Sequence, residues 1–303
     1  MIDVLTLGEA LVSFRTPGPL AGAWHAEAHV AGAEANVAIG LARLGHRAAW
    51  VGCVSDDDLG AWVAGTLASE GVDTRFVRRV PAASAGAMVL VDPSDHARQV
   101  TYLRRGSAGS RLEPADALAA LDSGVQWVHL SGITPALSES AREAWVVLAR
   151  EARMRSVRVC LDVNFRPALW SRHEAADALA SVRGLVNLLV ASDDEVDLID
   201  DPGIPVVVVK RGSAGATLIT PEESIDVPAA EVPVVDVIGA GDALCAGLLS
   251  GLLDLLTPVD ALRRGVWVAG RCVASAGDWE GLPTRVGLPP SGLSQPSPRP
   301  QLR

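Results

Sequence analysis

The chain has 303 residues, of which 49% are hydrophobic and 20% charged, and its formal net charge is −10. This size and composition predict a globular protein that buries a sizeable core. The acidic balance argues against nucleic acid or an anionic membrane surface as the main partner.

Apolar runs alternate with amphipathic segments along the chain. Buried strands are predicted at 2–7 and 47–53, and helices at 33–44 and 59–70, where Gly45 and Gly71 end the two helices. Further strands are predicted near 126–130, 158–162, 185–190 and 205–209, with helices between them. This order predicts an α/β fold with a mainly parallel sheet, helices on both faces and a site at the carboxyl ends of the strands.

Two segments, about 10–31 and 74–105, contain β-like pieces without helices between them. In the second, strands at 88–91 and 99–103 flank Asp92-Pro93-Ser94-Asp95, which is typical of a hairpin turn. We expect a small sheet that covers the strand ends as a lid, although a static β-meander at the sheet edge fits the same pattern. Residues 289–303 are rich in Pro and Ser and are predicted to be a disordered tail, which leaves 1–288 as the folded domain.

The N-terminal segment contains acidic residues and lacks the charged region of a signal peptide, and no apolar run reaches the roughly 18 residues of a membrane span. The four cysteines lie in apolar surroundings without CxxC spacing. We therefore expect a soluble cytoplasmic protein with reduced cysteines and no membrane partner.

The most informative motif is Gly239-Ala240-Gly241-Asp242, which follows an apolar run and opens a predicted helix. That helix carries Leu244, Leu248, Leu252 and Leu255 on one face. Gly239 and Gly241 allow a tight turn whose N–H groups, together with the positive end of the helix, bind an anion such as phosphate. Asp242 would repel a resting phosphate but suits a base that takes a proton from an attacking hydroxyl. The alternative is an ordinary acidic residue that compensates the helix dipole.

The loop and a second stretch, Ala31-Gly32-Ala33-Glu34-Ala35-Asn36-Val37-Ala38, together resemble the two signatures of the PfkB (ribokinase-like) carbohydrate kinases. Within that family the chain is most similar to 2-keto-3-deoxygluconate kinases, over nearly all of residues 1–287. The segments more specific to this sugar-acid branch are 106–110, 130–137 and 162–166. The resemblance implies a ribokinase-like three-layer α/β/α sandwich that binds ATP, with a β-sheet lid that often pairs across a dimer, and hence a homo-oligomer.

The resemblance also implies roles for individual residues. Asp242 would be the catalytic base, and the N–H groups of Gly239, Ala240 and Gly241 the anion hole. Ser192 and Glu195 occupy the family's Asn-x-x-Glu positions, whose acid organises Mg²⁺ and phosphate through water; Ser192 departs from that pattern. The family's usual Thr-Thr before the loop is Val237-Ile238 here, so a monovalent cation (K⁺) site built partly from Asp236 stays open.

Residues of the proposed sugar pocket come from several segments. Gly32 and Asn36 would contact sugar hydroxyls. The alternative is that Gly32 only forms the turn at the start of the helix and that Asn36 is a buried polar side chain with a packing role. Tyr102, Arg104 and Arg166 would suit a sugar that carries a carboxylate, because guanidinium binds carboxylate bidentately; the alternative is that such arginines are solvated. Met88 occupies the position where these kinases often have a lid tyrosine.

Lys210, Gly212 and Gly215 follow a predicted strand, and the resemblance places them near the nucleotide, although a simple turn explains them too. We predict an ATP-dependent kinase that converts 2-keto-3-deoxygluconate to its 6-phosphate, with an ordinary pKa near 3.9 sufficing for Asp242. The alternatives are a PfkB-type kinase for fructose, ribose or 5-keto-2-deoxygluconate, and a non-catalytic sugar-binding regulator.

Overall fold

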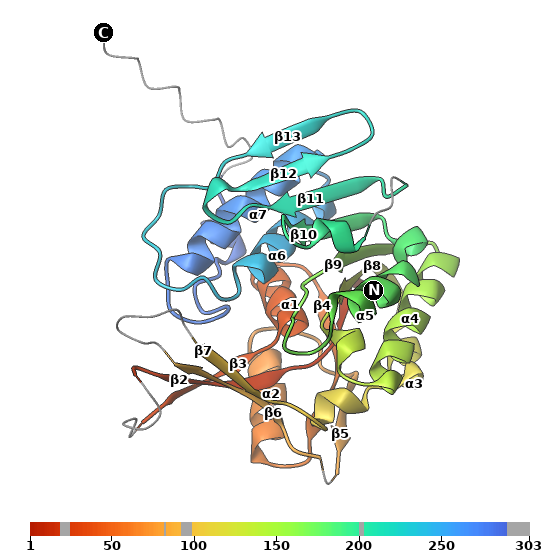
Figure 1. Cartoon of the computed structure of the whole chain (residues 1–303), viewed down its shortest axis with the longest axis vertical. Coiled ribbons are helices and arrows are strands. Elements are labelled where there is room, and N and C mark those ends of the chain that lie inside the picture. The colour runs from red at the N-terminus through yellow and green to blue at the C-terminus, as the bar shows by residue number, and fades with distance from the viewer. Residues whose placement is uncertain (19–24, 82, 92–98, 200–202, 290–303) are drawn as a thin grey trace.

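The computed structural model describes residues 1–18, 25–81, 83–91, 99–199 and 203–289, which form two sheets and the helices around them (Figure 1). The large sheet consists of β1 (Ile2–Leu7), β4 (Ala48–Ser55), β5 (Val77–Val80), β8 (Val125–Ser131), β9 (Arg158–Asp162), β10 (Leu188–Ser192), β11 (Val206–Lys210), β12 (Ala216–Ile219) and β13 (Ser224–Val227). Its order is β13-β12-β11-β10-β9-β8-β1-β4-β5. Every neighbouring pair from β11 to β5 is parallel, and the pairs β11–β12 and β12–β13 are antiparallel, so β12 runs against the other strands.

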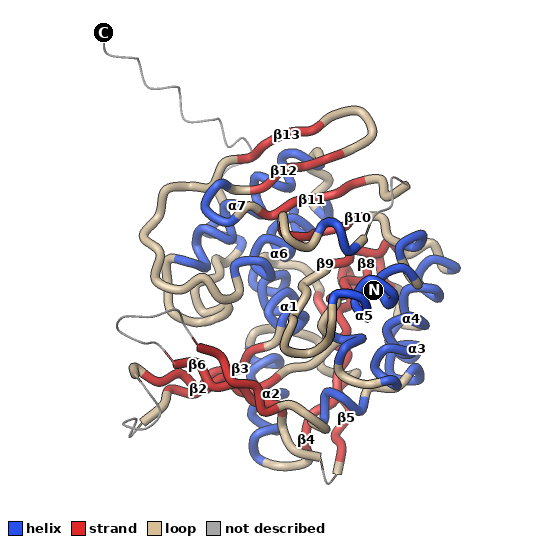
Figure 2. The backbone as a smooth tube through the Cα atoms, viewed as in Figure 1, coloured by secondary structure: helices blue, strands red, loops and turns tan. Residues whose placement is uncertain are grey.

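Helices cover both faces of the large sheet (Figure 2). The seven described α-helices are α1 (Ala33–Arg43), α2 (Asp58–Ser69), α3 (Pro114–Leu121), α4 (Glu139–Met154), α5 (Arg172–Ala180), α6 (Ala240–Leu253) and α7 (Pro258–Val273). One core cluster joins α1, α2, α6 and α7 to one sheet face, and a second joins α3, α4 and α5 to the other. The predicted α/β architecture with a mainly parallel central sheet is confirmed.

The predicted strands and helices agree closely with the observed ones. β1 and β9 have the predicted bounds, and α1 and α2 each differ by a single residue at one or both ends. α2 begins after Asp57, whose side chain accepts a hydrogen bond from the N–H of Gly60. None of the described helices is both long and apolar enough to cross a membrane.

A small four-stranded sheet stands apart from the large one. It consists of β2 (Leu11–Thr16), β3 (Glu27–Ala31), β6 (Gly86–Val91) and β7 (Gln99–Leu103), in the order β3-β2-β6-β7. The second expected lid segment, 74–105, is too wide, because β5 pairs with β4 in the large sheet. The expected hairpin turn at 92–95 and the tail from 290 onward lie outside the described residues.

One of the four leucines predicted on the face of the helix after the loop lies outside that helix. Leu244 and Leu248 are buried in the core beneath α6. The helix ends at Leu253, however, and Leu255 is 91% exposed with a positive φ of 61°. The chain turns after Leu253, so Leu255 no longer shares the face of the helix.

Candidate active site

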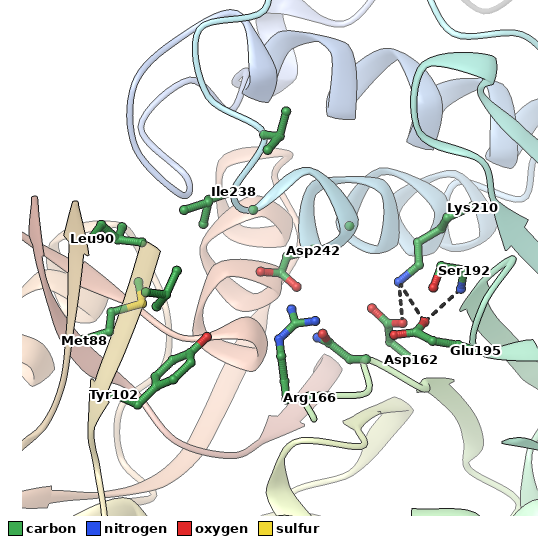
Figure 3. A pocket seen from close by; sticks show the side chains of 15 residues that line it. Met88, Leu90, Tyr102, Asp162, Arg166, Ser192, Glu195, Lys210, Ile238 and Asp242 are labelled. Atoms are coloured by element: carbon green, nitrogen blue, oxygen red, sulfur yellow. Dashed lines mark hydrogen bonds and ion pairs between the residues drawn. The ribbon is translucent and has the colours of Figure 1, made fainter. Parts of the chain in front are cut away.

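Three cavities lie along the carboxyl ends of the parallel strands, where β9, β10 and β11 end at Asp162, Ser192 and Lys210. The main cavity, of about 400 Å³, lies among Met88, Tyr102, Arg166, Lys210 and Asp242 (Figure 3). The inner cavity, of about 90 Å³, lies among Glu9, Gly32, Glu34, Asn36 and Arg104. The apolar slot, of about 480 Å³, lies among Gly212, Gly215, Val232, Val266 and Val273. Asp242 lines the first two cavities, and Val237 borders both the main cavity and the apolar slot.

The loop at 239–242 forms the start of α6. Gly239 caps the helix with a left-handed φ of 77°, and a Cβ on it would meet the Asp278 carbonyl oxygen at 1.9 Å. Gly241 lies in the helix, and a Cβ there would approach only the Lys210 side chain, at 3.5 Å. Gly239 is thus fixed by backbone conformation and packing, whereas Gly241 keeps space open beside the main cavity.

Not all three predicted amide donors of the loop are equally available. Among the described residues, the N–H groups of Gly239 and Gly241 have no hydrogen-bond partner, whereas that of Ala240 donates to the Val237 carbonyl over a long 3.4 Å. Gly239 and Gly241, at the positive end of α6, both line the main cavity. This start of a helix can bind an anionic oxygen group.

Asp242 is held in the first turn of α6 by a contact from another helix. The side chain of Asn36, buried in α1, donates from Nδ2 to Asp242 Oδ2 over 2.8 Å. Burial raises the pKa of Asp242 to about 7, and the Asn36 hydrogen bond opposes that shift. An ordinary pKa near 3.9 would suffice for a base in this transfer, but Asp242 has a higher one because the protein removes its carboxylate from water.

A second carboxyl group, Glu34, is fully buried beside the inner cavity. Its Oε1 accepts a 2.5 Å hydrogen bond from the Thr134 hydroxyl, and its Oε2 has no partner among the described residues. Burial raises the pKa of Glu34 to about 8, and the nearby charge of Asp242 adds to the shift. Since this value lies above 7, the neutral acid is the main form of Glu34 at pH 7.

The sugar-pocket residues predicted from the sequence come together around these two cavities. Gly32 caps α1 with a φ of 141°, and a Cβ on it would meet the Glu9 carbonyl oxygen at 2.4 Å. Met88 and Tyr102 are cross-strand partners in the small sheet and line both cavities. The small sheet therefore supplies one wall of the site (Figure 3).

The two arginines differ in how far their charge is already balanced. Arg104 is buried and forms an ion pair with Glu9, which also accepts a hydrogen bond from the Ser107 hydroxyl. Arg166 donates to the Phe165 carbonyl and has no ion-pair partner among the described residues. Figure 3 shows its guanidinium facing Asp242 across the main cavity. Arg166 is thus the cation free to meet an anionic group.

A polar cluster closes the far end of the main cavity. Lys210 Nζ lies 2.7 Å from Asp162 Oδ1 and 4.0 Å from Glu195 Oε2. Glu195 accepts 2.8 Å hydrogen bonds from the N–H groups of Ser192 and Phe165. Burial opposes the charge of Lys210, but Asp162 outweighs it and raises the pKa of this ammonium. The cluster combines a fixed ammonium with two carboxylates.

The predicted nucleotide residues are divided between two cavities. Lys210 lines the main cavity, whereas Gly212 and Gly215 line the apolar slot. Gly215 has a φ of 98°, and a Cβ on it would meet the Val227 carbonyl oxygen at 2.1 Å, so the turn explains this glycine without a ligand. The slot is nevertheless wide and apolar enough for a planar ring beside the start of α6.

Asp236 does not offer the open carboxylate that a monovalent cation site needs. Its side chain is buried and forms an ion pair with Arg15, which also bonds Asp278 Oδ1 at 2.6 Å. A guanidinium thus occupies the side of Asp236 that a cation would bind. The residues present do not fit K⁺ at this carboxylate.

The sequence does not point to three charged residues of the site, Glu9, Arg15 and Glu34, or to the pairing of Asp162 with Lys210. Glu9 and Arg15 lie on or beside a β-segment without a chemical signal, and Glu34 stands out only as part of a motif. Their pairings join segments more than 40 residues apart. Glycines make room for two of these carboxylates: Gly86 and Gly109 pack against Glu9, and Gly8 packs against Glu34.

Comparison with known proteins places this site in a family. The sequence pattern described as "pfkB family carbohydrate kinase" matches residues 2–285. A 2-dehydro-3-deoxygluconokinase of Thermoproteus tenax is 35% identical over 94% of this chain and 92% of its own length. A 2-dehydro-3-deoxygluconokinase of Bacillus subtilis is 32% identical over 95% of this chain and 94% of its own length.

A solved structure shares the fold. An uncharacterized sugar kinase of Pyrococcus horikoshii in complex with ATP superposes with a TM-score of 0.85 and 26% identity, over 94% of this chain and 96% of that one. The predicted ribokinase-like arrangement, a large sheet between helices with a separate small sheet, is confirmed.

Proposed function

Because the chain belongs to the pfkB family of carbohydrate kinases, we propose that it transfers the terminal phosphoryl group of ATP to a sugar acid, 2-keto-3-deoxygluconate, at its 6-hydroxyl. The observation that carries the proposal is Arg166, whose unpaired guanidinium faces Asp242 across the main cavity. A neutral sugar gives such a cation no counter-charge, whereas a carboxylate accepts two parallel hydrogen bonds from it. Relatives with the sugar-acid name, 32–35% identical over nearly the whole chain, support the same substrate class.

In this proposal the polar groups of the inner cavity hold the sugar. Gly32 lines the inner cavity with its backbone, and Asn36 keeps its Oδ1 unpaired. Tyr102 and Arg104 would contact the sugar from the small sheet, although Arg104 brings no net charge because Glu9 balances it. Met88 gives an apolar contact where a tyrosine hydroxyl would hydrogen-bond.

Asp242 would accept the proton of the attacking hydroxyl. A general base is most effective when its pKa lies near the operating pH, and a pKa near 7 meets this condition at neutral pH. The N–H groups of Gly239 and Gly241 would donate to the oxygens of the phosphoryl group as it leaves the nucleotide, because both residues line the main cavity and their N–H groups have no partner among the described residues. Ala240 would contribute its N–H only after giving up its long bond to Val237.

The nucleotide would lie along α6, with its base in the apolar slot beside Gly212 and Gly215 and its phosphates toward Lys210 and the loop at 239–242. Mg²⁺ neutralises phosphate charge in such transfers and usually keeps several waters. The residues fit that arrangement, since two carboxylates, those of Glu195 and Asp162, lie beside Lys210. The described part of the chain has no cluster of three or more side chains that could hold the ion without water. Glu195, bonded to two amides including that of Ser192, would orient water around the ion rather than bind it directly.

The substrate is tested by ADP release in a coupled assay with ATP, Mg²⁺ and a panel of 2-keto-3-deoxygluconate, 5-keto-2-deoxygluconate, fructose and ribose. We expect the highest kcat/KM for 2-keto-3-deoxygluconate, and R166M should lower it by about a hundredfold while changing that for fructose by less than about tenfold. R155M is the matched control, because Arg155 pairs with Asp122 and Glu151 and lines none of the three cavities. Higher kcat/KM for a neutral sugar, or equal losses on both sugars, would contradict the proposed substrate.

We also propose that two copies of the chain associate through the small sheet. β7 is an edge strand of that sheet, and its Val100 and Leu103 are 39% and 61% exposed. Light scattering after size-exclusion chromatography should give the mass of a dimer, and L103E should shift it to that of a monomer.

A further inference from the structure

Arg15 reaches from the small sheet to the loop that precedes α6. It lies on β2, and its guanidinium bonds the carboxylates of Asp236 and Asp278, with 2.6 Å between Nη2 and Asp278 Oδ1. All three side chains are nearly enclosed, with 10%, 1% and 4% of their surfaces exposed. Burial disfavours the charge of Arg15, yet the two carboxylates together raise the pKa of its guanidinium. Arg15 is therefore a permanent buried cation.

The two carboxylates are directly joined to the anion-binding loop. Asp236 Oδ1 accepts the N–H of Ile238 at 3.0 Å, and its Oδ2 lies 3.4 Å from the N–H of Gly277. Gly239, the next residue of the loop, packs against the carbonyl of Asp278. The position of the loop therefore depends on two segments whose carboxylates would repel each other without a cation between them.

We propose that Arg15 takes the place of a monovalent cation beneath the anion-binding loop, so that this kinase positions the loop without K⁺. A K⁺ ion at Asp236 would lie against a guanidinium in a water-poor region, where like charges repel strongly. Since Arg15 belongs to the small sheet, the same contact ties the sugar-side wall to the phosphate-side loop. Arg15 is a positioning residue and touches neither substrate.

The test compares wild type, R15M and R78M, each assayed in K⁺, in tetramethylammonium and in tetramethylammonium with guanidinium, at a constant ionic strength of about 0.1 M. The assay uses whichever sugar of the panel the wild type accepts, so the result does not depend on the identity of the substrate. R78M is the matched control, because Arg78 bonds Asp116 through two nitrogens at 2.7 and 2.8 Å, away from the cavities.

Wild type and R78M should have the same kcat in K⁺ and tetramethylammonium, within about twofold. R15M should lose about tenfold or more in kcat in tetramethylammonium, with a smaller change in sugar KM, and K⁺ or guanidinium should restore at least about fivefold. The melting temperature of R15M, measured without substrates, should likewise rise in K⁺, while that of wild type should not.

Three results would overturn the proposal. The first is a wild type that needs K⁺ for activity or melts at a higher temperature in K⁺ than in tetramethylammonium. This result would overturn the proposal even if R15M does not fold. The second is an R15M with wild-type turnover in tetramethylammonium. The third is a loss in R15M that neither K⁺ nor guanidinium restores, because Arg15 would then be an ordinary structural ion pair.

Discussion

The side chain of Asn36 donates a 2.8 Å hydrogen bond to the carboxylate of Asp242 and so joins the first turns of α1 and α6. The two residues are 206 positions apart in the sequence. A residue expected to bind the sugar thus also fixes the orientation of the expected base. The proposed sugar-binding and phosphate-binding parts of the site meet at this contact.

The pH dependence of kcat/KM should report the raised pKa of Asp242. A base must be unprotonated to act, so we expect kcat/KM to rise with pH through a midpoint near 7 and to fall about tenfold per unit below it. A profile that stays flat down to pH 5 would show that Asp242 titrates in its ordinary range.

D242N should lower turnover by about three orders of magnitude, because the amide cannot accept the hydroxyl proton and the transfer is left to positioning alone. Sugar binding, followed by calorimetry, should stay within about tenfold of wild type. Turnover above about a tenth of the wild-type rate would remove Asp242 as the base.

N36A should move the midpoint of the kcat/KM profile to higher pH. The Asn36 hydrogen bond stabilises the charged form of Asp242, so its loss leaves burial unopposed and raises the pKa of the carboxyl further. N187A is the control, because Asn187 accepts from the N–H of Val159 outside the three cavities. A midpoint that is equal in N36A and N187A would contradict this account.

E34Q should change how the free energy of unfolding depends on pH. The pKa of Glu34 is raised to about 8 in the folded protein from an ordinary 4.5, so the folded state holds a proton that the unfolded chain releases. Its contribution to stability is complete below about pH 4.5, decreases as pH rises, and is lost above about pH 8. E34Q should therefore gain stability relative to wild type between pH 5 and 8, in urea denaturation.

The exposed Glu174 gives the opposite control for E34Q. Backbone and side-chain hydrogen bonds from Ser171 lower the pKa of Glu174, so its contribution is present at neutral pH and lost in acid. E174Q should show no gain between pH 5 and 8. A gain of equal size in both variants would refute the burial argument for Glu34.

G239A should destabilise the protein and abolish most of its turnover. The left-handed backbone of Gly239 costs an alanine roughly 1–2 kcal/mol, and the Asp278 carbonyl must also shift to make room for the Cβ. G124A separates the two effects, since Gly124 has a φ of 76° and open space around it. We expect G124A to lose only the backbone part in thermal unfolding and to keep full activity; equal losses would contradict the steric argument.

Sequence patterns predicted the large sheet well because burial on both faces leaves long apolar runs. β1 and β9 have the predicted bounds, since each is a mostly apolar, buried strand; Gly8 follows the first, and Asp162 ends the second. In the small sheet β7 also has its predicted bounds, and β6, whose side chains alternate between buried and half-buried, begins two residues before the predicted start. β5 shows the limit: its sequence, Val77–Val80, does not reveal whether it pairs with β4 or with the lid.

The site was predictable where a motif fixes backbone geometry and not where it depends on long-range pairs. The glycines of the loop at 239–242 identify it in the sequence. In the structure Asp242 lines the same cavities as the residues expected for the sugar pocket. The Arg104–Glu9 pair and the Arg15–Asp236 pair have no local signal, because partners in different segments leave no spacing to read. The raised pKa of Asp242 also follows from burial that a sequence does not display.

Lys210 is the only lysine of the 303 residues, and its ammonium is held by Asp162 in the wall of the main cavity. Any reagent or modifying enzyme that acylates lysine side chains therefore has one target in the whole chain. The raised pKa of this amine and its ion pair with Asp162 keep it protonated, and acylation needs the neutral amine, so we expect its modification to be slow for as long as the ion pair is closed.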